Sequence, residues 1–136
     1  MKVLLQHAQG GRCQQLVDAA ADCHRAYCIK HDWTHVVNRE TLCFERAPVW
    51  GKIMLLQRTL AAWPAASVVA LLDADALIRR EDVDIAEARE DADLALTKGA
   101  GFCNSGFMLM RNSEKVRAFW DRVWEAGPIS AVSNWV

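Results

Sequence analysis

The sequence has no long apolar run, no surplus of charge of either sign and no regular cysteine pattern, and each lack excludes a class of protein. Its 136 residues carry a formal net charge of −1, which gives no electrostatic reason to bind nucleic acid or an anionic membrane. No apolar stretch approaches the length of a membrane-spanning helix. The first residues turn polar at Gln6, so they lack the long apolar region of a secretion signal.

The five cysteines are an odd number with irregular spacing. Such a set argues against a disulfide framework and predicts reduced thiols in a cytoplasmic protein. None forms the C-x-x-C pair that often binds zinc, and we expect most of them to be small core residues. With 52% apolar and 24% charged residues, residues 1–136 are expected to form one globular domain with its own core.

The most informative stretch is S-V-V-A-L-L-D-A-D-A-L-I, residues 67–78. Its short, partly β-branched apolar run predicts a strand buried on both faces. Asp73 and Asp75 follow at the carboxyl end, where open α/β sheets bind ligands. In extended chain, residues i and i+2 project to the same side, so both carboxylates could hold one Mn²⁺ or Mg²⁺ ion. In the simpler alternative, Asp73 starts a turn and Asp75 caps a following helix.

Strands and helices are predicted to alternate before this stretch, as in the β-α-β units of a parallel sheet. We expect strands over residues 2–7, 34–38 and 67–72, and amphipathic helices over 14–30 and 49–62. After an acidic surface segment (81–93), the apolar runs 94–96 and 107–110 flank a glycine-rich loop (98–106), and a last helix starts near Asn112 and Ser113. The helical period predicts three buried faces: Leu16, Ala20, Cys23 and Tyr27; Trp50, Ile53, Leu56 (or Met54) and Leu60; Val116, Phe119, Trp120 and Val123.

Three segments in this order resemble the GT-A glycosyltransferases, above all the galactosyl/mannosyltransferase group with its α-1,6-mannosyl- and xyloglucan xylosyltransferases. They are V-W-G-K-I-M-L-L-Q-R-T-L (49–60), L-L-D-A-D-A-L-I (71–78) and N-S-G-F-M-L-M-R-N-S (104–113). The likeness covers residues 1–120. It implies an α/β, GT-A-like fold with a mostly parallel central sheet flanked by helices. It also implies sugar transfer from a UDP- or GDP-linked donor to a glycan or other acceptor hydroxyl, with retained anomeric configuration.

By this resemblance, Asp73 and Asp75 hold Mn²⁺ or Mg²⁺ together with the ribose and diphosphate of the donor. Asn104, Ser105 and Gly106 match the loop beside the transferred sugar. An Asn offers donors and an acceptor to sugar hydroxyls, and glycines let backbone approach a bulky ligand. In the simpler alternative, Asn104 caps local backbone and the glycines only shape a tight connection.

Lys52 matches a lysine that faces the donor, where its charge would stabilise the leaving diphosphate. Gln6 and His7, at the end of the first strand, match the region that receives the nucleotide base and ribose. Lys52 could equally be a solvated helix residue, and His7 a surface or packing histidine.

The chain departs from this family in its length, because related transferases run well past two hundred residues. Their later part supplies a metal-binding histidine, whereas all four histidines here precede Asp73. The domain is therefore expected to be shortened at its carboxyl end, with water, donor phosphates or a partner subunit completing the metal shell. No catalytic base or nucleophile is assigned. Two alternatives stay open: a nucleotide-sugar-binding relative without activity, and a HAD-type Mg²⁺-dependent phosphatase with the first Asp as nucleophile.

Overall fold

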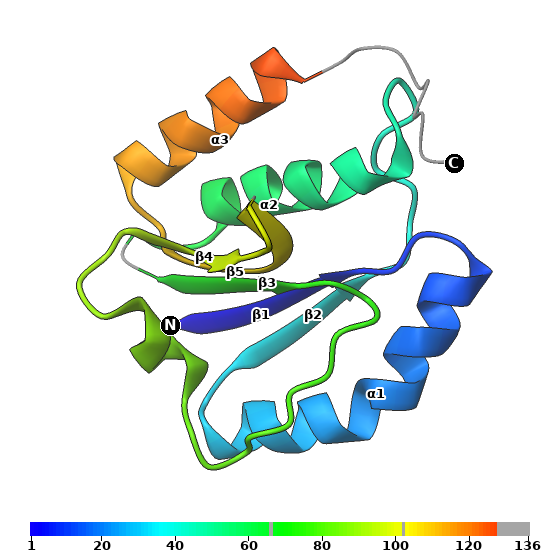
Figure 1. Cartoon of the computed structure of the whole chain (residues 1–136), viewed down its shortest axis with the longest axis vertical. Coiled ribbons are helices and arrows are strands. Elements are labelled where there is room, and N and C mark those ends of the chain that lie inside the picture. Colours follow the sequence, from blue (N-terminus) through cyan, green and yellow to red (C-terminus); the bar gives the residue numbers. More distant parts are fainter. Residues whose placement is uncertain (66, 102, 128–136) are drawn as a thin grey trace.

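The computed structural model describes residues 1–65, 67–101 and 103–127. Its strands are β1 (Lys2–His7), β2 (Thr34–Asn38), β3 (Val68–Leu72), β4 (Leu94–Lys98) and β5 (Cys103–Arg111). Its α-helices are α1 (Gly11–Lys30), α2 (Gly51–Ala62) and α3 (Glu114–Ala126), and two 3₁₀ turns are η1 (Pro48–Trp50) and η2 (Ile85–Arg89). The sheet separates α1 on one face from α2 and α3 on the other, so the domain has three layers (Figure 1).

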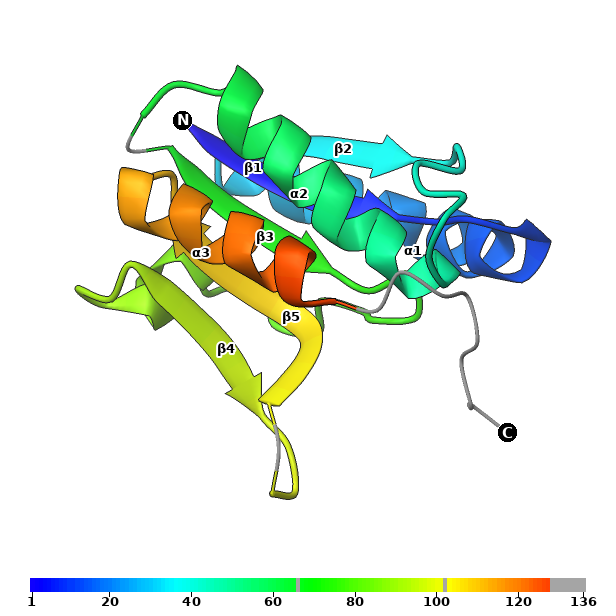
Figure 2. The ribbon, with the colours of Figure 1, turned by 90° about the horizontal axis from the view of Figure 1, so that it is seen from above.

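The strand order is β2-β1-β3-β5-β4. β1 pairs in parallel with both β2 and β3, whereas β5 is antiparallel to β3 and to β4. Within the described part of the chain, four of the five strands therefore run the same way and only β5 is reversed. Figure 2 shows β4 at the open edge of this sheet. The predicted α/β class and the mostly parallel sheet are confirmed.

Both faces of the central strands are covered, which explains their uninterrupted apolar sequence. On the α2 and α3 side, Val3, Val69 and Leu71 pack with side chains of both helices. On the α1 side, Leu4 and Ala70 pack with Tyr27 and other residues of that face. Because alternate residues of one strand enter opposite cores, the sheet cannot slip by one residue without exchanging the two apolar sets.

The predicted helix faces need three corrections. α1 starts at Gly11, and its buried residues are Val17, Ala20, His24, Tyr27 and Cys28. Leu16 is exposed instead, because α1 packs on the sheet with a face rotated from the predicted one. Residues 48–50 form the separate turn η1, so Trp50 is only partly buried and packs against the core. On α3, Val116 and Trp120 are buried as predicted, but Phe119 is 38% exposed.

The other local expectations have mixed outcomes. Ser113 caps α3, since its hydroxyl accepts the backbone N–H of Val116. All five cysteines are free thiols, as expected, but only Cys28 and Cys43 are buried. Cys13 and Cys23 are partly exposed and Cys103 is exposed, so the prediction that most of the cysteines are core residues is wrong. In the described ranges, no helix is long and apolar enough to span a membrane.

Candidate functional site

A cleft of about 500 Å³ opens at the carboxyl ends of β1 and β3. The amino ends of α1 and η1–α2 form its sides, because in a parallel sheet each helix begins where the preceding strand ends. Backbone N–H groups at helix amino ends carry partial positive charge and favour anions. The polar side chains in its lining are His7, Gln9, Arg12, Lys52, Asp73 and Asp75.

The D-A-D segment forms a turn rather than extended chain. The backbone N–H of Ala76 donates to the Asp73 carbonyl at 3.1 Å, and the Asp73 N–H donates to the Gly106 carbonyl at 2.8 Å. The expected convergence of the two carboxylates through strand geometry is therefore wrong, and Asp73 does start a turn. Both aspartates nevertheless line the same cleft, because the turn follows the carboxyl end of β3 directly.

Lys52 is only 8% exposed and binds both sides of the site. Its Nζ donates to Asp73 Oδ1 at 3.0 Å and to Ser105 Oγ at 2.9 Å. The Ser105 carbonyl lies 3.3 Å from the same nitrogen. A cation buried in this way is stable only when it is paired and hydrogen-bonded. Lys52 is therefore not a solvated helix residue, and it fixes the positions of Asp73 and of β5.

The predicted glycine-rich loop is shorter than expected, because β5 already begins at Cys103 and contains Asn104, Ser105 and Gly106. Pairing with β4 shifts between Leu96 and Thr97, so three residues of β5 bulge out of the ladder. Bulges of this kind reorient side chains next to functional sites. Here the bulge brings Ser105 within reach of Lys52.

Gly106 lies where a side chain would collide with two site residues. An added Cβ would be 2.9 Å from Asn104 Oδ1 and 3.2 Å from Asp73 Oδ2. Asn104 Oδ1 already accepts the Gly106 N–H at 2.7 Å, so Asn104 caps local backbone as well as lying at the site. Because residue 106 is glycine, β5 can approach the Asp73 carboxylate closely.

Gly106→Ala is expected to displace Asn104 or Asp73. The nucleotide binding that the family resemblance implies should then weaken about tenfold, the cost of a contact moved by a few tenths of an ångström. We expect only a small change in melting temperature, because the site is open to solvent on one side. Calorimetric titration and thermal melting measure both effects. Gly11→Ala is the matched control, since its added methyl meets no atom within 4 Å. Equal affinities of the two variants would contradict this role of Gly106.

Gln6 was expected to contact the donor, but its side chain is fully buried beneath the cleft. Its Oε1 accepts from His24 Nδ1 at 3.1 Å and from His35 Nε2 at 3.0 Å. Its Nε2 donates to the Asp73 carbonyl at 3.3 Å, and His24 Nε2 accepts the Ile78 N–H at 3.4 Å. Because His24 donates through Nδ1 and accepts at Nε2, its imidazole must be neutral. The network anchors both ends of the D-A-D loop, so Gln6 is a positioning residue.

Burial lowers the pKa of His24 below 6.5, and burial with the charges of His24 and Arg25 lowers that of His35. The folded state therefore binds fewer protons than the unfolded chain below about pH 6.5, and the free energy of unfolding falls as pH drops through that value. We expect the melting temperature to decrease from pH 7.5 to 5.5. His35→Asn should flatten this dependence, whereas His31→Asn, which removes a histidine outside the network, should not. If the melting temperature of His35→Asn fell with pH as steeply as that of the wild type, the lowered pKa of His35 would not contribute to stability, contrary to this expectation.

His7 lines the cleft. Its Nδ1 lies 3.1 Å from Asn38 Nδ2, and burial, together with the charge of Lys52, holds its pKa below 6.5 against a raising contribution from Gln9. Its Nε2 is buried without a partner in the described residues. α2 can begin beside this ring only because residue 51 is glycine, since a Cβ there would come within 2.3 Å of Nε2. A neutral imidazole is thus presented to the cleft.

The donor set fits a divalent cation in part. Among the described residues, no group of three His, Cys, Asp or Glu side chains could hold a metal ion. Lys52 binds Asp73 Oδ1. The oxygens that could contact a cation are therefore Asp73 Oδ2, which lies beside Gly106, and the exposed Asp75 carboxylate. Two hard carboxylates suffice for Mg²⁺ or Mn²⁺ where substrate phosphates and water fill the other positions.

Three polar or rim residues of the cleft were missed from the sequence: Gln9, Arg12 and Pro48. Arg12 lies in the first turn of α1, directly after the glycine pair that follows β1. A glycine turn between a strand and a helix with a cation in the first turn is a signal that sequence reasoning could have used.

Comparison with known proteins indicates a family and a similar fold. A family model described as the galactosyl transferase GMA12/MNN10 family matches residues 2–88. The fold is similar to the crystal structure of a glycosyltransferase involved in the glycosylation of the major capsid of PBCV-1, with a TM-score of 0.71 and 15% sequence identity. That match covers 91% of this chain and 65% of the other. No curated protein sequence matches the chain.

Proposed function

Because the chain belongs to the galactosyl transferase GMA12/MNN10 family, we propose that it transfers a sugar from a nucleotide-diphospho-sugar to an acceptor hydroxyl with the help of Mn²⁺ or Mg²⁺. One observation carries the proposal. Asp73, Asp75 and Lys52 line a single open cleft at the carboxyl ends of parallel strands, which is where α/β folds bind nucleotides.

The reaction forms a bond between the acceptor oxygen and the anomeric carbon of the donor. The bond from that carbon to the diphosphate breaks, the diphosphate leaves with the electron pair, and the acceptor proton passes to the leaving diphosphate or to water. A divalent cation, when bound, acts as a Lewis acid toward the leaving diphosphate. Asp73 and Asp75 are the residues that would hold it.

The remaining roles follow from the charges and contacts of the cleft. Lys52 and Arg12 supply positive charge on two sides of a bound diphosphate. Asn104 and Ser105 are exposed at the start of β5 and offer hydrogen bonds to sugar hydroxyls. The ring of His7 lines the cleft and offers a flat surface to the base or ribose of a UDP- or GDP-linked donor.

The phosphatase alternative has no support in the comparisons, which give a galactosyl transferase family and a glycosyltransferase of similar fold. The inactive relative remains the second candidate, because the described residues supply two carboxylates and no third protein ligand.

Calorimetric titration with UDP and GDP, with and without Mn²⁺, tests the proposal when combined with an assay of sugar release from the matching nucleotide sugars. We expect tight binding of one nucleotide only when Mn²⁺ is present, together with turnover. Metal-dependent binding without turnover on any donor and acceptor would favour the inactive relative. Absence of nucleotide binding would overturn the proposal.

A further inference from the structure

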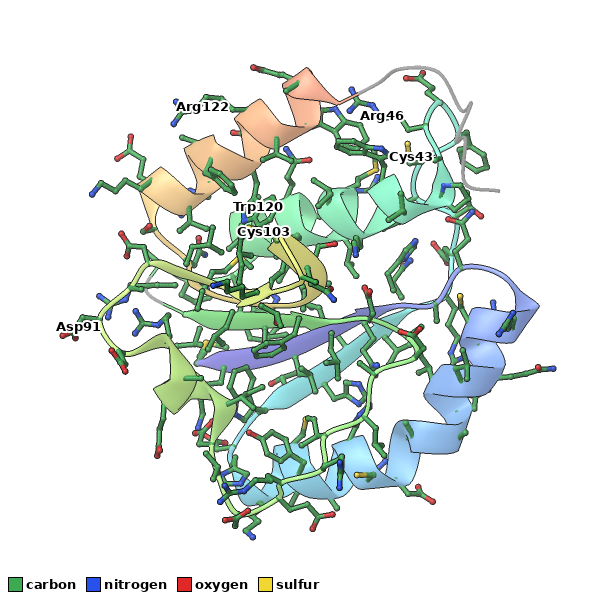
Figure 3. The ribbon with its side chains drawn as sticks, in the orientation of Figure 1. Cys43, Arg46, Asp91, Cys103, Trp120 and Arg122 are labelled. Carbon is green, nitrogen blue, oxygen red and sulfur yellow. The ribbon has the colours of Figure 1, made fainter. Side chains whose placement is uncertain are left out.

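A second cavity of about 420 Å³ lies beside the cleft, between α2, α3 and the β4–β5 hairpin. We call it the aromatic pocket, and its main apolar lining is Trp50, Ile53, Leu96, Met108, Phe119 and Trp120. Figure 3 shows Trp120 and Cys103, both in its lining, close together between α3 and the hairpin. Of its lining residues, only Lys52, Asn104 and Ser105 have a role in the proposed function, and the apolar lining residues have none.

The pocket has two chemically different ends. Its polar lining residues are Lys52, Asn104, Ser105 and Cys103. Lys52 Nζ donates the 2.9 Å hydrogen bond to Ser105 Oγ that was described for the cleft. The rest of the wall is aliphatic or aromatic. A cavity of this size with a few polar groups at one end is typical of small-molecule sites.

The pocket is open to solvent although its rim is apolar. Val49 is 51% exposed, and Leu96 and Phe119 are each 38% exposed. Phe119 lies on the face of α3 that its helical period predicts to be buried, so this face is only partly covered by the described residues. Covering such a rim with an apolar group removes unfavourable contact with water.

The pocket and the cleft share a wall. Lys52 and Val49 line both cavities, and Lys52 binds Asp73 on one side and Ser105 on the other. A molecule with its apolar part in the pocket and a hydroxyl at the Ser105 end would therefore place that hydroxyl next to the donor site.

We propose that the aromatic pocket binds an acceptor substrate carrying an aromatic group, and that it directs the acceptor hydroxyl toward the donor. This inference rests on the proposed function, because it assigns the second substrate of the same site. Edge-to-face contacts with Trp50, Phe119 and Trp120 favour an aromatic group over a purely polar sugar chain.

The test compares 2-naphthyl β-D-galactopyranoside with methyl β-D-galactopyranoside by calorimetric titration into the full chain. We expect the naphthyl compound to bind at least about tenfold more tightly, since it alone fills the apolar wall. Phe119→Ala should reduce naphthyl affinity about fivefold. Phe44→Ala is the matched control, because Phe44 is 85% exposed and belongs to neither cavity lining. Thermal melting verifies that both variants stay folded.

Nucleotide titration on the same samples separates this inference from the proposed function. If UDP or GDP binds with Mn²⁺ but the two galactosides bind equally, or if Phe44→Ala acts like Phe119→Ala, the pocket assignment is overturned and the proposed function stands. If naphthyl binding is selective but no nucleotide binds, the acceptor role falls together with the proposed function. Transfer to the naphthyl compound that is faster than to the methyl compound, and is slowed in Phe119→Ala, supports the inference.

Discussion

Asp75→Asn is expected to lower the Mn²⁺-dependent affinity for UDP or GDP by about a hundredfold or more. The amide has no charge, so it is a far weaker ligand for a hard cation than the carboxylate. Asp75 is exposed and lies beyond the end of β3, so the melting temperature should stay within about 2 °C, as for most surface substitutions. Calorimetric titration with and without Mn²⁺ measures the first effect and thermal melting the second.

Asp91→Asn is the matched control for this variant. Asp91 is an exposed aspartate outside the cleft lining and lies in the loop near η2, as labelled in Figure 3. It should bind nucleotide as the wild type does. If Asp75→Asn kept wild-type affinity in Mn²⁺, the metal would have to be held without this carboxylate.

Lys52→Met should reduce both stability and nucleotide binding. Removing one partner of a buried ion pair costs about 3–5 kcal/mol. The side chain of Asp73 is 37% exposed, so water compensates for part of this, and we expect a loss of about 2 kcal/mol. For a domain of this size that corresponds to a melting temperature lower by about 6 °C. Loss of the cation beside the diphosphate should also weaken nucleotide binding about tenfold or more.

Two further variants test whether the loss of stability in Lys52→Met comes from the broken ion pair with Asp73. Lys115→Met changes an exposed lysine on α3 and should leave the melting temperature nearly unchanged. In Lys52→Met combined with Asp73→Asn, the unpaired carboxylate is gone, so the double variant should be more stable than the sum of the single effects predicts. Additive effects would mean that the two side chains do not interact, contrary to their 3.0 Å contact.

Much of the fold could be predicted from local sequence. The buried run at 68–72 identified the central strand because a strand covered on both faces has no polar alternation. The Asn112–Ser113 start of the last helix was found because capping is a local interaction between a hydroxyl and the first turn. The position of D-A-D at a strand end followed from the same reasoning, and β3 ends at Leu72, directly before Asp73.

Features that depend on packing between distant segments could not be predicted. Gln6 and His24 are 18 residues apart and meet only when α1 packs on β1. The chain pattern gave no sign that their side chains hold the D-A-D loop from below. Likewise, the inward face of α1 was misplaced because a helix with polar residues all round, including a buried histidine, has a weak apolar stripe.

In the site, too, the features that depend on contacts between distant segments could not be predicted from the local sequence. Lys52 could be proposed only through resemblance, because a lysine on a helix is usually solvated, and its burial depends on contacts with β3 and β5. The bulge between β4 and β5 was missed because a register shift leaves no signature in the composition of either strand. The glycine-rich segment therefore looked like a loop although its second half is a strand.

The proposed sugar transfer depends on a cation held between the two aspartates and a diphosphate. A crystal structure of the protein with Mn²⁺ and its preferred nucleotide, UDP or GDP, tests this most directly. We predict Mn²⁺ in contact with Asp73 Oδ2, the Asp75 carboxylate and oxygens of both phosphates, with Lys52 still bound to Ser105. A nucleotide bound in another cavity, or in this cleft with Mn²⁺ on neither aspartate, would contradict the account.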